Sequence, residues 1–315
     1  MQQRIHNDSA IRSTTGATVD RSRTGMGRYL VYCTERLNDL LLTETGYFPR
    51  SVELADTELR EIITACNAAI APFGRRVSDR RWISYLDVVH GQSERRVVDR
   101  EAFKAVCILN NILFIWDDLD PRLKDLELLL PKIRAICERY YCNMDDVWWA
   151  YQGVRSWLVH DRSFSDSREL TSVMCRDLEN YTRLRVTDLG PDWWMKASYP
   201  IYRDPDFTEH CRSGLAAWLT VRPLFIVNDL YSYDREHELG ELKNCYNLCD
   251  VTDEHAFLEY FDARLYDLQH DIATIKAFDQ ITRDVLLDLI YGHFTWATKS
   301  DRYQGAVNTF NAPVS

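Results

Sequence analysis

The sequence predicts an all-α protein that folds as one large domain. From about residue 27 onward it is a series of amphipathic stretches, in which apolar side chains recur at spacings of three and four. Strand signals are sparse, because the 315 residues include only 12 Gly and 9 Pro and lack alternating stretches joined by Asn-Gly or Asp-Gly turns. No stretch has the composition of an interdomain linker, and the 46% hydrophobic content is enough for one substantial core.

The helices are expected one after another, separated by short polar or proline-containing joints. Their expected ranges are 27–44, 52–73, 78–92, 99–119, 122–141, 144–161, 167–188, 191–200, 206–236, 253–275 and 279–297. Residues 1–26 are polar and lack the apolar core of a secretory signal, so we expect a disordered tail ahead of a domain over 27–315. An Arg-rich transit peptide is the alternative for this tail.

Charge and cysteine content limit the possible partners and the compartment. The formal charge of -10 argues against nucleic acid or an anionic membrane as the main partner, so a phosphate ligand needs local help from divalent cations. No apolar run is long enough to cross a bilayer, so no membrane insertion is expected. The nine cysteines include no CxxC pair, which is typical of buried thiols in a reducing, cytoplasmic compartment.

The helix expected over 99–119 ends in an unusual group of acids. Its buried stripe runs through Asn110 and Phe114 to Asp117, and Asp118 and Asp120 follow directly. Crowded carboxylates raise one another's pKa unless a cation joins them, and carboxylate oxygens suit a hard ion such as Mg²⁺. A solvated helix end is the alternative, although acids at a helix C-terminus oppose the helix dipole.

A second oxygen-rich face follows the apolar run at residues 224–227. Asn228, Ser232 and Glu236 are spaced i, i+4 and i+8, so they lie nearly above one another on one helical face. An amide oxygen, a hydroxyl and a carboxylate can together chelate one small hard cation. The alternative is an ordinary polar face, with Asp234 and Arg235 in solvent.

Together these motifs resemble those of bacterial class I terpene synthases. Asp117, Asp118 and Asp120 match the Asp-rich motif of that family, although only Leu119 separates the last two acids where the family usually has two residues. This shortened form leaves Asp117 as the safest metal ligand. Asn228, Ser232 and Glu236 match the family's Asn-Ser-Glu triad. Further matches are Arg185 to the diphosphate-sensing arginine, Asp188 to its linker, Leu189 to the effector carbonyl, and Arg302 and Tyr303 to the C-terminal Arg-Tyr pair.

The resemblance implies a helical bundle around a central active-site cavity, with three magnesium ions held at its mouth. It implies that Arg185, Arg235, Arg302 and Tyr303 bind the diphosphate of an isoprenoid substrate. The segments RWISY (81–85), RVTDLG (185–190) and NDLYSYDRE (228–236) resemble those of diterpene cyclases, which use geranylgeranyl diphosphate. Homodimers are usual in the family.

A carbocation intermediate needs an unreactive, dry cavity, and aromatic faces supply one. By spacing, Phe114 lies one turn below Asp117, and Asn110 lies two turns below. By resemblance, Trp157, Trp194 and Trp296 also line the cavity, with Trp116, Trp193 and Phe225 as weaker candidates. For each aromatic residue, plain core packing is the alternative. The histidines show no shared spacing and are given no catalytic role.

Three other functions remain open from the sequence. One is a sesquiterpene cyclase acting on farnesyl diphosphate, and another is a chain-elongating prenyltransferase, although that class carries two Asp-rich motifs. The third is a non-catalytic helical scaffold.

Overall fold

A computed structural model of the chain describes residues 25–45, 54–76, 97–117, 119, 123–165 and 168–299. Within these residues the secondary structure is helical and includes no strand, which confirms the all-α prediction. Several sequence predictions lie outside the described residues: most of the N-terminal tail, the helix expected over 78–92, and the site residues Asp118, Asp120, Arg302 and Tyr303.

The helices follow the expected order with a few differences in their bounds. The first half holds η1 (Gly25–Arg28), α1 (Leu30–Thr45), α2 (Asp56–Ile70), η2 (Ala71–Phe73), α4 (Arg100–Asp117), α5 (Leu126–Tyr140) and α6 (Met144–Ser165). The second half holds α7 (Arg168–Met174), α8 (Leu178–Asp188), α9 (Pro191–Tyr202), α10 (Pro205–Arg212), α11 (Leu215–Glu238), η6 (Cys245–Leu248), α12 (Glu254–Lys276) and α13 (Gln280–Lys299).

Two stretches expected as single helices are each divided in two. The stretch 167–188 breaks before Asp177, whose carboxylate caps α8 by accepting the backbone N–H of Asn180 at 2.8 Å. The stretch 206–236 breaks at Gly214, whose φ of 80° is left-handed. In both cases the apolar residues keep the same helical periodicity on either side of the break, so the periodicity alone does not reveal that the helix ends there.

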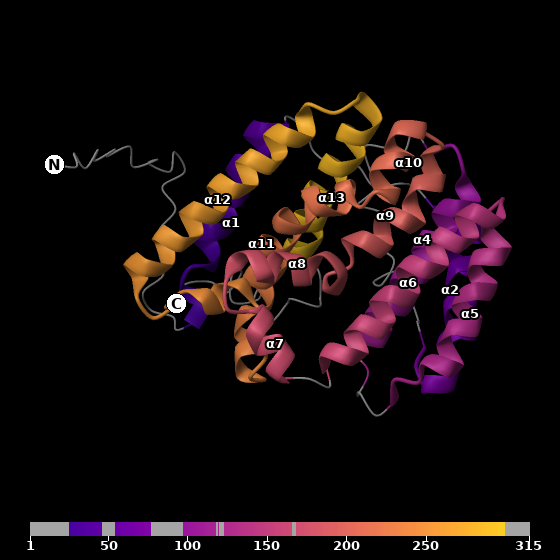
Figure 1. Cartoon of the computed structure of the whole chain (residues 1–315), viewed down its shortest axis with the longest axis horizontal. Coiled ribbons are helices and arrows are strands. Elements are labelled where there is room, and N and C mark those ends of the chain that lie inside the picture. Colours follow the sequence, from indigo (N-terminus) through magenta and orange to yellow (C-terminus); the bar gives the residue numbers. More distant parts are fainter. Residues whose placement is uncertain are drawn as a thin grey trace.

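Helix α11 is central to the fold and packs against α8, α9, α12 and α13 (Figure 1). Helix α1 lies along α12 on one side, whereas α2, α4, α5 and α6 form the other side. Helix α9 bridges the two groups, because it contacts α4 and α6 as well as α11. The long helices α4 and α11 both pack against α9 and therefore lie on either side of the same interior space.

The chain is already packed at residues that were expected to belong to the disordered tail. Met26 is only 2% exposed, and its backbone N–H donates to the Asp234 carboxylate at 2.9 Å. The N–H of Gly27 donates to the other carboxylate oxygen at 3.2 Å. Asp234 thus ties η1 to α11, so the placing of Gly25 and Met26 in a tail is corrected. The alternative interpretation of the α11 face, with Asp234 in solvent, does not fit these bonds.

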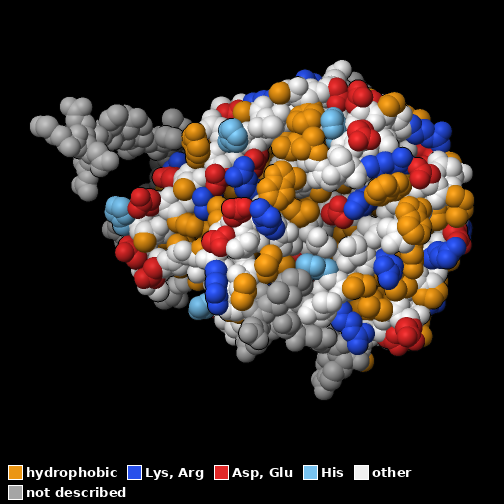
Figure 2. All heavy atoms as spheres, viewed as in Figure 1, with side chains coloured by type: hydrophobic (Ala, Val, Ile, Leu, Met, Phe, Trp, Pro, Cys, Tyr) orange, Lys and Arg blue, Asp and Glu red, His pale blue; other side chains and the backbone are white. Residues whose placement is uncertain are grey.

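The surface carries no large area of one charge in the view of Figure 2, where basic and acidic side chains alternate with small apolar groups. No helix in the described ranges is both long enough and apolar enough to cross a membrane. The cysteines are free thiols, and most are buried as expected, although Cys142 is exposed.

Candidate active site

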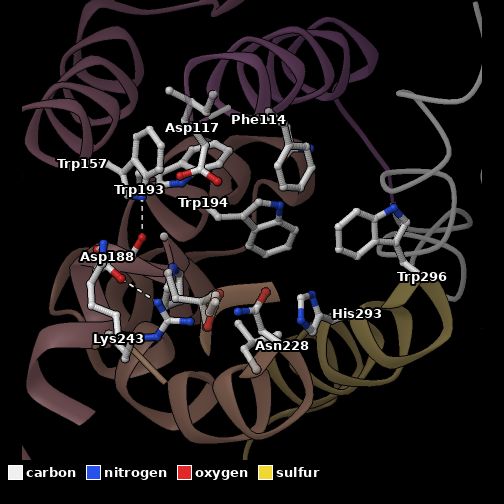
Figure 3. Close-up of a pocket in the computed structure, with 18 of the residues that line it drawn as sticks. Phe114, Asp117, Trp157, Asp188, Trp193, Trp194, Asn228, Lys243, His293 and Trp296 are labelled. Carbon is white, nitrogen blue, oxygen red and sulfur yellow. Dashed lines mark hydrogen bonds and ion pairs between the residues drawn. The ribbon is translucent and has the colours of Figure 1, made fainter. Parts of the chain in front are cut away.

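A cavity of about 450 Å³ opens among α4, α6, α8, α9, α11 and α13. Its charged residues come from the end of α4, the end of α8, the second half of α11 and the segment that follows α11. Aromatic and aliphatic side chains from α4, α6, α9 and α13 cover the remaining wall (Figure 3). The cavity thus combines a charged side with an apolar side.

Asp117 is the last residue of α4 and lines the cavity, as does Leu119 just beyond it. Its neighbour Trp116 does not line the cavity, so the weak prediction for that residue is wrong. Trp116 is 1% exposed, and its indole N–H donates to Asp161 at 3.1 Å, where Lys124 also donates at 2.9 Å. This buried group fixes the end of α4 to α6, and thereby places Asp117.

The facing wall comes from α11. Asn228 and Glu236 line the cavity, whereas Ser232 between them is 1% exposed and donates its hydroxyl to the Asn228 carbonyl at 2.9 Å. Asn244 donates to the Glu236 carboxylate at 2.9 Å. Burial, and secondarily the charge of Asp229, raise the pKa of Glu236 to about 7.

The carboxylate, amide and hydroxyl oxygens on these two helices are ligands that a hard divalent cation such as Mg²⁺ prefers. The raised pKa of Glu236 agrees with the fit, because a buried carboxyl group beside the charge of Asp229 is stabilised as a carboxylate when a cation binds to it. Among the described residues, no three His, Cys, Asp or Glu side chains already converge as a metal site. Asp117 and Glu236 instead stand on separate walls of one cavity.

The end of α8 holds the second group of charges. Arg185 donates to the Asp188 carboxylate at 2.6 Å and to that of Asp229 at 2.8 Å. Leu189 caps the helix, and Gly190 turns the chain with a φ of 97° before α9 begins. Arg185, Asp188 and Leu189 all line the cavity. The three residues expected to sense the diphosphate therefore lie together, at the break between two helices.

Asp188 has two further contacts that the sequence did not indicate. Lys243 donates to its carboxylate at 2.8 Å, and the indole N–H of Trp157 donates to its backbone carbonyl at 2.7 Å (Figure 3). Burial alone would raise the pKa of Asp188, but Lys243 and Arg185 hold it well below its usual value. Trp157 therefore both lines the cavity and positions the break between α8 and α9.

The apolar wall contains most of the predicted aromatic residues. Phe114 and Trp296 stack with ring centroids 5.4 Å apart, and Trp157, Trp193 and Trp194 also line the cavity. Phe225 does not, because it is fully buried behind the wall and packs edge-on against Tyr181. Asn110 lines the cavity at 4% exposure, and its amide nitrogen has no hydrogen-bond partner among the described residues.

Among the residues of the site that sequence reasoning missed are Asp229, Lys243 and His293. Asp229 comes only two residues after the apolar run at 224–227, and this position could have indicated that its carboxylate is buried. His293 lies three residues before Trp296, so the two share one face of α13. Burial first, and then the charge of Arg185, lower the pKa of His293 to about 3. Lys243 belongs to no helix and gave no spacing signal.

The chain is 52% identical over 303 residues to cyclooctat-9-en-7-ol synthase of Streptomyces melanosporofaciens, and the match covers 96% of this chain and 98% of that enzyme. No family model matches.

Proposed function

This chain belongs to the bacterial terpene synthases, and from that membership we propose that it is a class I diterpene cyclase. It ionises geranylgeranyl diphosphate, folds the resulting carbocation into rings and releases diphosphate. The observation that carries the proposal is the shared cavity, which is lined by Asp117 from α4, by Asn228 and Glu236 from α11 and by an aromatic wall. The relative named above is a synthase of cyclooctat-9-en-7-ol, and the match covers 98% of its length.

Two sets of residues would hold divalent metal, which we take to be three magnesium ions. Asp117, with Asp118 and Asp120, forms one set, and Asn228, Ser232 and Glu236 form the other. Bound there, magnesium supplies positive charge against the departing diphosphate. The Ser232 hydroxyl lies against the Asn228 carbonyl at 2.9 Å and also contacts the Glu236 carboxylate, so it stands within this second set.

The arginines of the site hold the diphosphate. Arg185 and Arg235 line the cavity, and we assign Arg302 and Tyr303 to the same role by family resemblance. A pair of unit charges 4 Å apart attracts by about 4 kcal/mol at an effective dielectric constant of 20. Arg185 is 5% exposed, so water weakens its attraction little. These cations favour the charge that develops when the carbon–oxygen bond breaks.

The apolar wall keeps water away from the carbocation and stabilises it through aromatic faces, by about 0.5 to 2 kcal/mol for each face. His293 adds to this because its low pKa keeps the ring neutral, and a charged imidazolium would repel the cation. Asn110 lines the same space, and we assign its amide the role of orienting an intermediate.

Incubation with geranylgeranyl, farnesyl or isopentenyl diphosphate, with and without magnesium, tests the function. We expect a cyclic C20 product from geranylgeranyl diphosphate that requires the metal. A product from farnesyl diphosphate alone would indicate a sesquiterpene cyclase, and lengthened chains with isopentenyl diphosphate would indicate a prenyltransferase. If no substrate is turned over, the proposal fails and a scaffold role is favoured.

Changes to the stacked pair Phe114 and Trp296 are expected to alter the products more than the stability. Phe114→Leu and Trp296→Phe remove or reshape a face that the substrate touches, so cations should be deprotonated or quenched at other positions. Gas chromatography of the products and thermal melting measure the two effects. Phe103→Leu is the matched control, because Phe103 is fully buried on α4 away from the cavity. It should cost about 1 to 2 kcal/mol of stability and leave the products unchanged.

A further inference from the structure

We propose that Lys243 is a further diphosphate-binding residue, which exchanges its bond to Asp188 for a phosphate oxygen when the substrate enters. The proposal rests on the proposed function, since it concerns the leaving group of that reaction. Lys243 lies outside the two metal motifs and outside the residues assigned to the diphosphate above.

The chain delivers Lys243 to the metal-binding side of the cavity. The segment after α11 turns back on Glu236, where the Glu241 N–H donates to the Glu236 carbonyl at 2.8 Å. Asn244, the next residue after Lys243, donates both to the Glu236 carboxylate and to the Asp229 carbonyl, at 2.9 and 2.8 Å. Lys243 therefore stands at a fixed place beside the Asn-Ser-Glu triad and lines the cavity (Figure 3).

Lys243 can leave Asp188 without exposing an unpaired buried charge. Its ammonium nitrogen lies 2.8 Å from one carboxylate oxygen of Asp188, while Arg185 holds the other oxygen at 2.6 Å. Asp188 thus keeps a strong partner when Lys243 turns away. An ammonium has three N–H donors and a flexible stem, so Lys243 can bind phosphate and remain near Asp188.

The two arginines among the described residues of the cavity are less suited to such an exchange. Arg185 is bonded to two buried carboxylates, and its side chain is only 7% exposed. Arg235 is 47% exposed and lies 3.8 Å from Glu236, at the outer edge of the site. The Lys243 side chain is intermediate, at 24%. Burial alone would lower the pKa of Lys243, but Asp188, together with Asp117 across the cavity, raises it and keeps the ammonium charged.

Binding of inorganic pyrophosphate in the presence of magnesium, measured by calorimetry, tests the proposal on the full chain. We expect Lys243→Ala to weaken binding roughly 10- to 50-fold and Lys243→Arg to retain most of the affinity. Lys196→Ala is the matched control. Lys196 forms the same kind of ion pair with Asp192 at 2.8 Å and is 19% exposed, but it does not line the cavity. Its loss should leave pyrophosphate binding unchanged.

A double-mutant cycle separates direct binding from an indirect effect through Asp188. If Lys243 contacts phosphate, Lys243→Ala will weaken binding in the Asp188→Asn background as well. If Lys243 only holds Asp188 in place, it will have no further effect there, and the proposal is overturned. Unchanged pyrophosphate affinity in Lys243→Ala would also overturn it. A wild-type protein that binds no pyrophosphate and turns over no geranylgeranyl diphosphate would instead remove the proposed function.

Discussion

Asn228→Ala and Asp117→Ala are each expected to lower kcat by at least roughly 10³-fold while the helical circular dichroism stays unchanged. Each substitution removes an oxygen donor from one wall of the cavity, and the reaction needs positive charge held at both walls. The fold should tolerate the change, because Asn228 and Asp117 both border the cavity and neither is needed to fill the core. Turnover of geranylgeranyl diphosphate at saturating magnesium measures the effect.

Glu238→Ala is the control for these two variants. Glu238 is an exposed acid on the last turn of α11, two residues beyond Glu236, and it does not line the cavity. Its removal changes the net charge by the same amount as Asp117→Ala and should leave kcat within about twofold, because surface substitutions away from a site have small effects. Full activity in Asn228→Ala or Asp117→Ala would remove that residue from the metal site.

The parts of the site that the sequence predicted are those with a regular spacing. Asn228, Ser232 and Glu236 were found because positions i, i+4 and i+8 share one helical face, whatever the rest of the chain does. Asp117 was found because a buried stripe ended in acids. The spacing of residues on one helix does not predict how deeply each side chain is buried. The hydrogen bond from the Ser232 hydroxyl to the Asn228 carbonyl of the same helix was therefore not predicted.

The parts of the site that were not predicted from the sequence depend on contacts between segments far apart in the chain. Lys243 reaches Asp188 across 55 positions, and Trp157 reaches the same residue across 31. Trp116 and Phe225 face the core, not the cavity, because of neighbours supplied by other helices. The breaks inside 167–188 and 206–236 were missed for a local reason, since a capping Asp and one left-handed Gly leave the apolar spacing intact.

The buried acid Asp229 carries the largest expected effect on stability. It is 0% exposed and accepts hydrogen bonds from the Tyr181 hydroxyl, from Arg185 at 2.8 Å and from the Cys245 N–H at 2.9 Å. These partners tie α8, α11 and η6 together behind the polar side of the cavity. Asp229→Ala leaves a buried hydroxyl and a buried N–H without their acceptor, and leaves Arg185 with Asp188 alone.

We expect Asp229→Ala to lower the free energy of unfolding by about 3 to 5 kcal/mol, which is typical of removing one partner from a buried charge pair. Asp229→Asn keeps an acceptor oxygen but not the charge, so its loss should be smaller. Urea titrations followed by circular dichroism give the midpoints. Glu179→Ala on α8 is the control, since its pairing with Arg183 is exposed and contributes about 0.3 to 0.5 kcal/mol. Equal midpoints for Asp229→Ala and Glu179→Ala would show that Asp229 does not hold these elements together.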